Sequence, residues 1–215
     1  MKLPRKPQAV VFDLDGTLID SEALVRTAYD AVLPRFGVTM SDAQFLSLVG
    51  LHRDLNNAQL RSFYGANFPL EDFYASVRAQ VGERTAPLKD GASELMDALD
   101  AHRLPFGLAT SSYRPWVERH LAAHALDARF TAIVTRDDVA NGKPHPEPYL
   151  NIAAALGTAP ANVLALEDSY AGVTSAHAAG LMTVMIPDLL PPTDDMRAKA
   201  LLVLPSLHDV HALLS

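Results

Sequence analysis

Two aspartates, Asp13 and Asp15, directly follow a short apolar stretch, Ala9–Phe12. The length and the β-branched content of this stretch predict a buried strand. Because alternate residues of a strand point the same way, both carboxyl groups project together beyond its carboxyl end. Paired carboxylates repel each other, so such a site either recruits a cation or keeps one acid protonated. Gly16 then allows a tight turn or the close approach of a ligand, and Thr17 can order the loop.

Polar side chains also follow the later apolar stretches of the chain. They are Thr110 with Ser111, Lys143 in the loop 141–144, and Glu167 with Asp168. Parallel strands place their carboxyl ends along one edge of a sheet, so these groups converge although they are distant in sequence. Carboxylates, hydroxyls and a fixed cation together suit phosphoryl transfer with Mg²⁺, which prefers oxygen ligands. In such chemistry an aspartate can attack phosphorus and form an acyl phosphate.

The elements that must position these groups change in character along the chain. From residue 90 onward, strands are predicted at 104–109, 132–135, 163–166, 183–186 and, at an edge, 201–204, with helices between them. This alternation predicts an α/β fold with a Rossmann-like parallel sheet and helices on both faces. Between the first strand and residue 90 only helical patterns occur, at 21–36, 42–48, 54–64 and 70–81.

The helical region is too long for an ordinary crossover between parallel strands. It spans roughly seventy residues, whereas such a crossover needs only about a dozen. We therefore predict an inserted α-helical cap over residues 20–86, and a catalytic core made of residues 1–19 and 87–215.

Composition sets wider limits on the class of protein. The chain has 215 residues, a formal net charge of −7 and no cysteine. The charge disfavours a nucleic-acid partner, and the lack of cysteine excludes disulfides and thiol nucleophiles. No stretch has the length of a membrane span, and the N-terminus is not typical of a signal peptide. We expect a cytoplasmic protein without a membrane partner, while the oligomeric state cannot be predicted.

Four motifs give the sequence a resemblance to a known superfamily. They are Asp13-Leu14-Asp15-Gly16-Thr17, Thr110, Lys143-Pro144 and Glu167-Asp168. In this order they are similar to the motifs of the haloacid dehalogenase-like hydrolases, and the resemblance covers essentially the whole chain. The helical insert resembles the cap of the subgroup that contains β-phosphoglucomutase and phosphoglycolate phosphatase-like enzymes.

The resemblance implies a catalytic role for each core residue. Asp13 would be the nucleophile, and Asp15 would protonate the leaving oxygen and later activate water. Thr110 would hold the phosphoryl group through its hydroxyl, helped by the backbone amide of Ser111. Lys143 would balance the negative charge of Asp13 and the phosphate.

The resemblance also implies a metal site and a set of substrate contacts. Mg²⁺ would be bound by Asp13, Asp168 and the backbone carbonyl of Asp15, with Glu167 as an additional or outer ligand. Substrate contacts are expected from Gly16, Thr17, Ser111 and, in the cap, Arg53.

Departures from other members of the superfamily narrow the activity. Dehalogenases lack the second aspartate, so Asp15 indicates phosphate-ester chemistry. Phosphonate hydrolases use a cap lysine, and the segment 21–82 contains none. β-Phosphoglucomutases carry a histidine where this chain has Val25, which weakens a mutase interpretation.

These residues bear on three classes of function: an enzyme, a binding protein and a signalling receiver. The favoured one is a Mg²⁺-dependent phosphatase that hydrolyses a small phosphorylated metabolite, a sugar phosphate or a phospho-organic acid, through an aspartyl phosphate. A β-phosphoglucomutase-type phosphomutase is the alternative enzyme, and a catalytically silent phosphate-ligand binding protein on the same fold stays open. A signalling receiver domain is disfavoured, because receivers have no helical insert and no acid at the position of Asp15. We expect His52, His145 and Trp116 to be packing or surface groups, and Asp194 and Asp195 to lie in a solvated turn.

Overall fold

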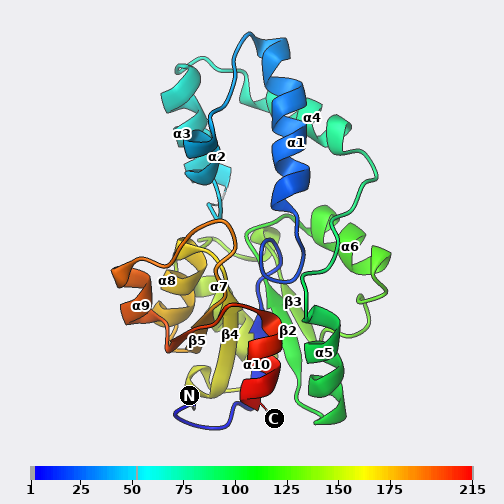
Figure 1. The fold of residues 1–215 in the computed structure, drawn as a ribbon, viewed down its shortest axis with the longest axis vertical. Helices are drawn as coiled ribbons and strands as arrows, with labels where there is room; N and C mark the ends of the chain where they lie inside the picture. The colour runs from blue at the N-terminus through cyan, green and yellow to red at the C-terminus, as the bar shows by residue number, and fades with distance from the viewer. Residues whose placement is uncertain (1–2, 52, 215) are drawn as a thin grey trace.

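A single parallel sheet forms the base of the molecule (Figure 1). The computed structural model describes residues 3–51 and 53–214. Six strands pair in the order β3-β2-β1-β4-β5-β6, and every pair is parallel. Their bounds are β1 Ala9–Phe12, β2 Phe106–Ala109, β3 Ala132–Val134, β4 Val163–Glu167, β5 Met182–Met185 and β6 Leu202–Val203. The predicted Rossmann-like fold class is confirmed.

Helices cover both faces of this sheet, and alternate strand residues serve the two faces. Val10 and Phe12 of β1 pack in a cluster with α5 (Ala92–Ala101), α6 (Arg114–Ala123) and α10 (Leu207–Leu214). Ala9 and Val11 of the same strand pack with α7 (Glu147–Ala155) and α8 (Tyr170–Ala178). All four side chains of β1 are fully buried. A strand buried on both faces reads as a continuous apolar run, which explains the sequence that precedes Asp13.

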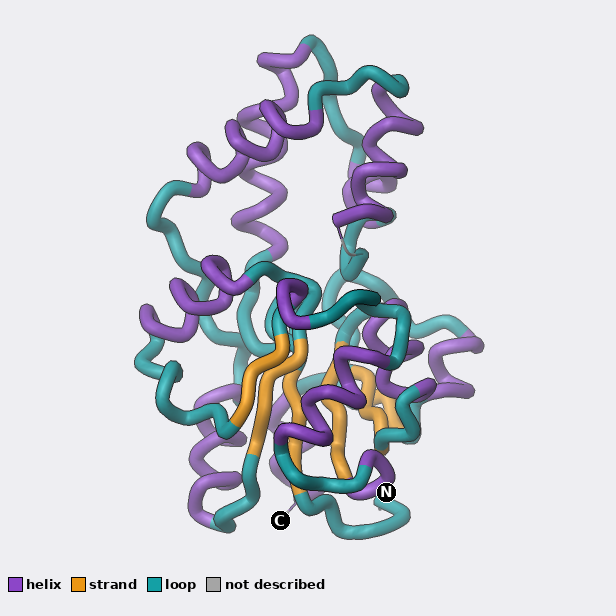
Figure 2. Tube along the Cα trace, turned by 180° about the vertical axis from the view of Figure 1, so that it is seen from behind, coloured by secondary structure: helices purple, strands orange, loops and turns teal. Residues whose placement is uncertain are grey.

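Four helices pack together as a second body over one edge of the sheet (Figures 1 and 2). They are α1 (Glu22–Val32), α2 (Asp42–Leu46), α3 (Arg53–Tyr64) and α4 (Leu70–Val81), and we call them the cap helices. The ring of Phe73 lies at their centre, fully buried, with its centroid 5.0 Å from that of Tyr29. Because the cap helices have a hydrophobic core of their own, they can hold their shape without relying on the sheet.

Proline and glycine shorten the first cap helix relative to the prediction. The pattern 21–36 predicts one helix, but α1 ends at Val32 and a 3₁₀ turn covers Leu33–Phe36. Pro34 lies within this turn, and Gly37 closes it in the left-handed region with φ 73°. A proline cannot donate the backbone hydrogen bond of a continuing α-helix, so the chain tightens and stops there.

The prediction of a solvated turn at Asp194 and Asp195 is wrong. These residues begin α9 (Asp194–Lys199), where the Thr193 hydroxyl accepts a hydrogen bond from the Met196 amide at 3.3 Å. Threonine is a favourable N-cap, and carboxylates are stabilised at the positive end of a helix. The buried side chain of Met196 then fixes this helix against the core.

Within the described residues, no helix is both long enough and apolar enough to cross a membrane.

Candidate active site

Lys143 joins the ends of three strands at the edge of the sheet that faces the cap helices. Its ammonium group donates to Asp13 Oδ1 at 2.5 Å, to Glu167 Oε1 at 2.5 Å and to the carbonyl of Ala109 at 2.8 Å. Its side chain is only 2% exposed, so all three donor hydrogens are used inside the protein. Burial disfavours the charge of this lysine, yet Asp13 and Glu167 outweigh that effect and raise the pKa of Lys143.

Three carboxyl groups gather beside Lys143. Asp13, Glu167 and Asp168 each place an oxygen within 4.8 Å of the other two, and all three side chains are buried. Burial raises the pKa of Asp13 to about 8; Lys143 opposes this shift, and Glu167 and Asp15 reinforce it. Burial, Asp13 and Glu167 likewise raise the pKa of Asp168 well above its ordinary value. The cluster therefore carries more potential negative charge than Lys143 can balance, and a divalent cation would relieve it.

The predicted ligands Asp168 and Glu167 have different surroundings. Asp168 Oδ1 accepts one hydrogen bond, from the Thr17 hydroxyl at 3.0 Å. Glu167 Oε1 accepts from Lys143 and from the Tyr149 hydroxyl at 2.7 Å, and its Oε2 accepts from the Ser169 hydroxyl at 3.1 Å. Glu167 is thus surrounded by protein donors and holds Lys143 in place, whereas Asp168 accepts fewer hydrogen bonds from the described residues.

Gly16 lets the loop after β1 fold tightly over Asp168. Its φ is +84°, and a Cβ atom at this position would lie 2.4 Å from Asp168 Oδ2. Glycine avoids both the backbone strain and the collision. The structure therefore places Gly16 and Thr17 against the acidic cluster, whereas both were predicted to contact the substrate.

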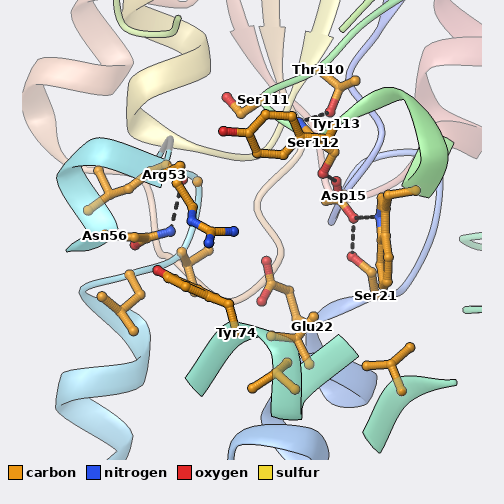
Figure 3. Close-up of a pocket in the computed structure, with 18 of the residues that line it drawn as sticks. Asp15, Ser21, Glu22, Arg53, Asn56, Tyr74, Thr110, Ser111, Ser112 and Tyr113 are labelled. Atoms are coloured by element: carbon orange, nitrogen blue, oxygen red, sulfur yellow. Dashed lines mark hydrogen bonds between the residues drawn. The ribbon is translucent and has the colours of Figure 1, made fainter. Parts of the chain in front are cut away.

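Asp15 lines the cavity and is held by three donors (Figure 3). Its Oδ1 accepts from the Ser21 hydroxyl at 2.6 Å and from the Trp116 indole at 3.0 Å. Its Oδ2 accepts from the Ser112 hydroxyl at 2.6 Å. A carboxylate with three donors has a fixed orientation at the entrance to the acidic cluster.

Trp116 contributes more than the packing that the sequence predicts for it. Its ring packs against the core and also against the cluster of the cap helices, and its N–H donates to Asp15. Its only sequence signal is its position in the helix that begins just after Thr110-Ser111-Ser112. The hydrogen bond joins residues 101 positions apart, so it becomes visible only in the fold.

The hydroxyls that follow β2 complete the core side of the site. Thr110 is buried, and its Oγ1 accepts a hydrogen bond from the Ser112 amide at 3.0 Å. The Ser111 hydroxyl is buried and has no partner among the described residues. Both side chains line the same cavity as Asp13 and Lys143. Donors at this position suit an anionic ligand bound next to Asp13.

A cavity of about 880 Å³ extends from these core groups to the cap helices (Figure 3). Arg53 lies on its cap side, with the guanidinium carbon 3.5 Å from the ring centroid of Tyr74 and Nη2 3.8 Å from Glu71 Oε1. Glu22, which the sequence analysis did not single out, also lines the cavity. Burial raises the pKa of Glu22 to about 8, and Asp15, Asp188 and Asp20 add to the shift. The structure thus brings Arg53 into the same cavity as the core residues, at its far side.

Comparisons with known proteins agree with this arrangement. The model of the family described as haloacid dehalogenase-like hydrolase matches residues 10–186, which includes every core residue described above. The chain belongs to this family.

Individual members of the family place the chain among its phosphatases. Validoxylamine A 7'-phosphate phosphatase of Streptomyces hygroscopicus subsp. limoneus is 33% identical over 181 residues, which cover 82% of this chain and 84% of the relative. A probable pseudouridine-5'-phosphatase of Drosophila melanogaster is 35% identical over 195 residues, 87% of this chain and 84% of the relative. A putative β-phosphoglucomutase from Thermotoga maritima has a similar structure, with a TM-score of 0.77, 27% identity, and coverage of 96% of this chain and 97% of that one. The haloacid dehalogenase-like hydrolase described here is a phosphoric monoester hydrolase.

Proposed function

We propose that this enzyme is a Mg²⁺-dependent phosphatase that hydrolyses a small phosphorylated metabolite, a sugar phosphate or a phospho-organic acid, through an aspartyl phosphate on Asp13. The observation that carries the proposal is the buried contact between Asp13 and Lys143 at the bottom of a cavity that Asp15 also lines. A nucleophile, a charge-balancing cation and a second acid thus meet where a phosphate ester can enter. In this proposal residues 20–86 are the cap, and residues 1–19 and 87–215 form the catalytic core.

The first half of the reaction transfers the phosphoryl group to the protein. A carboxylate oxygen of Asp13 attacks phosphorus, and the bond between phosphorus and the ester oxygen breaks. Asp15 gives a proton to that oxygen, so the leaving group departs as a neutral alcohol. Lys143 and the Thr110 hydroxyl stabilise the negative charge on the phosphoryl oxygens.

The second half returns the enzyme to its starting state. Asp15, now a carboxylate, takes a proton from a water molecule, whose oxygen attacks phosphorus. The bond between phosphorus and Asp13 breaks, and inorganic phosphate leaves. Val25 lines the cavity at the position where mutases carry a histidine, which favours water over a sugar hydroxyl as the acceptor.

The acidic cluster fits a magnesium ion. Its donors are carboxylate oxygens, which Mg²⁺ prefers, and burial together with the neighbouring carboxylates raises the pKa values of Asp13 and Asp168. Asp13, Asp168 and the backbone carbonyl of Asp15 would hold the ion, while the donors around Glu167 favour an outer role for that residue. A bound Mg²⁺ would neutralise charge on the phosphoryl oxygens as the nucleophile approaches.

The test is phosphate release from a panel of phosphorylated metabolites, with Mg²⁺ and with a chelator, by the wild type and by Asp13→Asn. We expect Mg²⁺-dependent release by the wild type and a loss of about 10³-fold or more in the variant, because the amide cannot act as nucleophile. Asp127→Asn, which changes an exposed aspartate of the core, should behave as the wild type. Near-normal turnover by Asp13→Asn would contradict the covalent mechanism. Conversion of β-glucose 1-phosphate without phosphate release would instead indicate the mutase.

A further inference from the structure

Glu22 presents a carboxyl group to the cavity without any hydrogen-bond or ion-pair partner among the residues that the structure describes. It is the first residue of α1, directly after Ser21, whose hydroxyl donates to Asp15. In Figure 3 its carboxyl group points into the same space as the guanidinium of Arg53. Glu22 is partly buried, and a carboxyl group that is removed from water without a partner is costly to a protein unless a ligand supplies one.

The position of Glu22 suits contact with the leaving group of the substrate. The ester oxygen must lie near Asp15, which protonates it, so the atoms beyond that oxygen extend toward the cap helices. Glu22 lies close enough to Asp15 for the two charges to interact, and it is on the cap side of it. The carbon atoms next to the ester oxygen therefore come within reach of Glu22.

The charges around the cavity disfavour an acidic leaving group. Six acidic and four basic side chains line it. Of the basic ones, Lys143 is committed to Asp13 and Glu167, and Arg53 stacks on Tyr74 with Glu71 at 3.8 Å. Arg119 donates to the carbonyl of Gly82, and Arg78 lies at an exposed position of α4. A carboxylate on the leaving group would add a further negative charge to this acidic excess.

Hydroxyl groups match the unused hydrogen-bonding capacity on the cap side. The Tyr74 hydroxyl and Asn56 Oδ1 are buried, line the cavity, and have no partner within the described chain. The carboxyl group of Glu22 can accept a hydrogen bond from a hydroxyl, and burial, which raises its pKa, favours the protonated form that can also donate one. An alcohol has the same pair of functions, whereas an apolar or anionic group does not.

We propose that Glu22 is a specificity-determining residue: its carboxyl group hydrogen-bonds to hydroxyls of the leaving group and selects neutral polyol phosphates over phosphorylated carboxylic acids. This inference rests on the proposed phosphatase function and names its substrate class. Sites that hydrogen-bond a substrate hydroxyl discriminate strongly against analogues without it, because their own polar groups are then left unpaired. In this proposal Glu22 determines which leaving group is bound, while Asp13 and Asp15 carry out the reaction.

The experiment compares kcat/KM for three substrates: sorbitol 6-phosphate, which is a polyol; phosphoglycolate, which carries a carboxylate; and propyl phosphate, which has neither group. For the wild type we expect the order sorbitol 6-phosphate, propyl phosphate, phosphoglycolate, with about tenfold or more between the first two. Glu22→Leu should lower kcat/KM for sorbitol 6-phosphate about 10- to 100-fold, the cost of hydrogen bonds left unmade. Activity on propyl phosphate should stay within about twofold, because that substrate offers Glu22 no hydroxyl.

Two further variants separate hydrogen bonding from other effects. Glu22→Gln keeps one donor and one acceptor at nearly the same volume, so it should retain sorbitol 6-phosphate activity within about threefold. Glu83→Leu, at an exposed position near the end of α4, should match the wild type on all three substrates. Thermal melting of each variant shows whether it is folded, and the substrate order of the wild type tests the proposal even if Glu22→Leu does not fold.

The outcomes distinguish this inference from the proposed function. Release of phosphate with equal kcat/KM for the three substrates, or an equal loss on all three in Glu22→Leu, would overturn the role of Glu22 and leave the phosphatase intact. A wild-type preference for phosphoglycolate would overturn it as well. If no phosphate is released from these three substrates or from any other phosphate ester, the proposed function is overturned, and this inference with it.

Discussion

The two sides of the cavity differ in how completely their polar groups are paired. On the core side, Lys143 uses all three of its donor hydrogens and Asp15 accepts three hydrogen bonds, and the Ser111 hydroxyl is the exception without a partner among the described residues. On the cap side, Glu22, the Tyr74 hydroxyl and Asn56 Oδ1 lack partners within the described residues. Groups that perform one reaction can be fixed in advance, because the phosphoryl group is the same in every substrate.

The polar groups without partners on the cap side reflect a different requirement. A leaving group varies between substrates, so the groups that recognise it must stay available until it binds. The site residues on the core side also lie at or near the ends of strands. Those on the cap side lie on helices that have a separate hydrophobic cluster. In our proposal the chemistry and the choice of substrate are carried by separately packed parts of one chain, and three predictions test that division.

The largest effect is expected for Lys143→Met, which removes the cation between two buried carboxyl groups. Breaking a buried ion pair leaves Asp13 and Glu167 uncompensated, so we expect about 3 kcal/mol or more of stability to be lost. Urea denaturation at pH 7 in the presence of chelator measures the loss. Lys199→Met, which removes an ion pair with Asp195 on the surface, is the matched control and should cost about 0.5 kcal/mol or less. Equal losses in the two variants would show that the core side is not the tightly paired region described here.

A smaller effect is expected for Trp116→Phe, which keeps an aromatic ring but removes the donor to Asp15. We expect kcat to fall about tenfold and KM to stay within about twofold, since one hydrogen bond to the catalytic acid is lost. Steady-state kinetics on the best substrate of the panel measures both. Tyr113→Phe removes a polar atom from the same cavity and leaves the donors to Asp15 unchanged, so its kcat should match the wild type. A rise in KM alone would place Trp116 with substrate binding instead.

The smallest effect concerns the stability that Glu22 costs the folded protein. The pKa of Glu22 is about 8 in the folded protein and 4.5 in the unfolded chain, so the folded state retains a proton that the unfolded state loses between these values. Wild-type stability should therefore fall as pH rises through this window, and Glu22→Gln should escape that fall. Relative to the wild type, we expect the variant to gain about 1 kcal/mol between pH 5 and pH 8.5, well below the full shift because the carboxyl group borders the cavity and is only partly buried.

Denaturant unfolding of Glu22→Gln and the wild type at the two pH values measures this gain. Glu83→Gln, at an exposed position, is the control and should show the same difference from the wild type at both pH values. A constant difference for Glu22→Gln would mean that its carboxyl group is solvated like one on the surface.

The sequence predicts this fold and the core residues of the site well, because both follow from local patterns. Residues 9–12, 104–109 and 163–166 read as apolar strands, and each is followed by the polar groups that the structure gathers at one edge. Glu22 and Trp116 could not be found in this way. A glutamate at a helix start and a tryptophan in a helix are common, and their surroundings come from residues brought together only by folding. By contrast, the local signal for α9 was present in Thr193 and the two aspartates after it.

The central place of β1 in the sheet has a consequence for how the protein is made. This strand is the first of the six to be synthesised, yet its partners lie at Phe106 and Leu164, so it has no neighbour to pair with until about half of the chain exists. At typical rates of translation, both aspartates leave the ribosome roughly ten seconds before the residues that will surround them. A nascent chain halted midway carries Asp13 and Asp15 but neither Lys143 nor Glu167, so the site is complete only once the last third of the chain emerges.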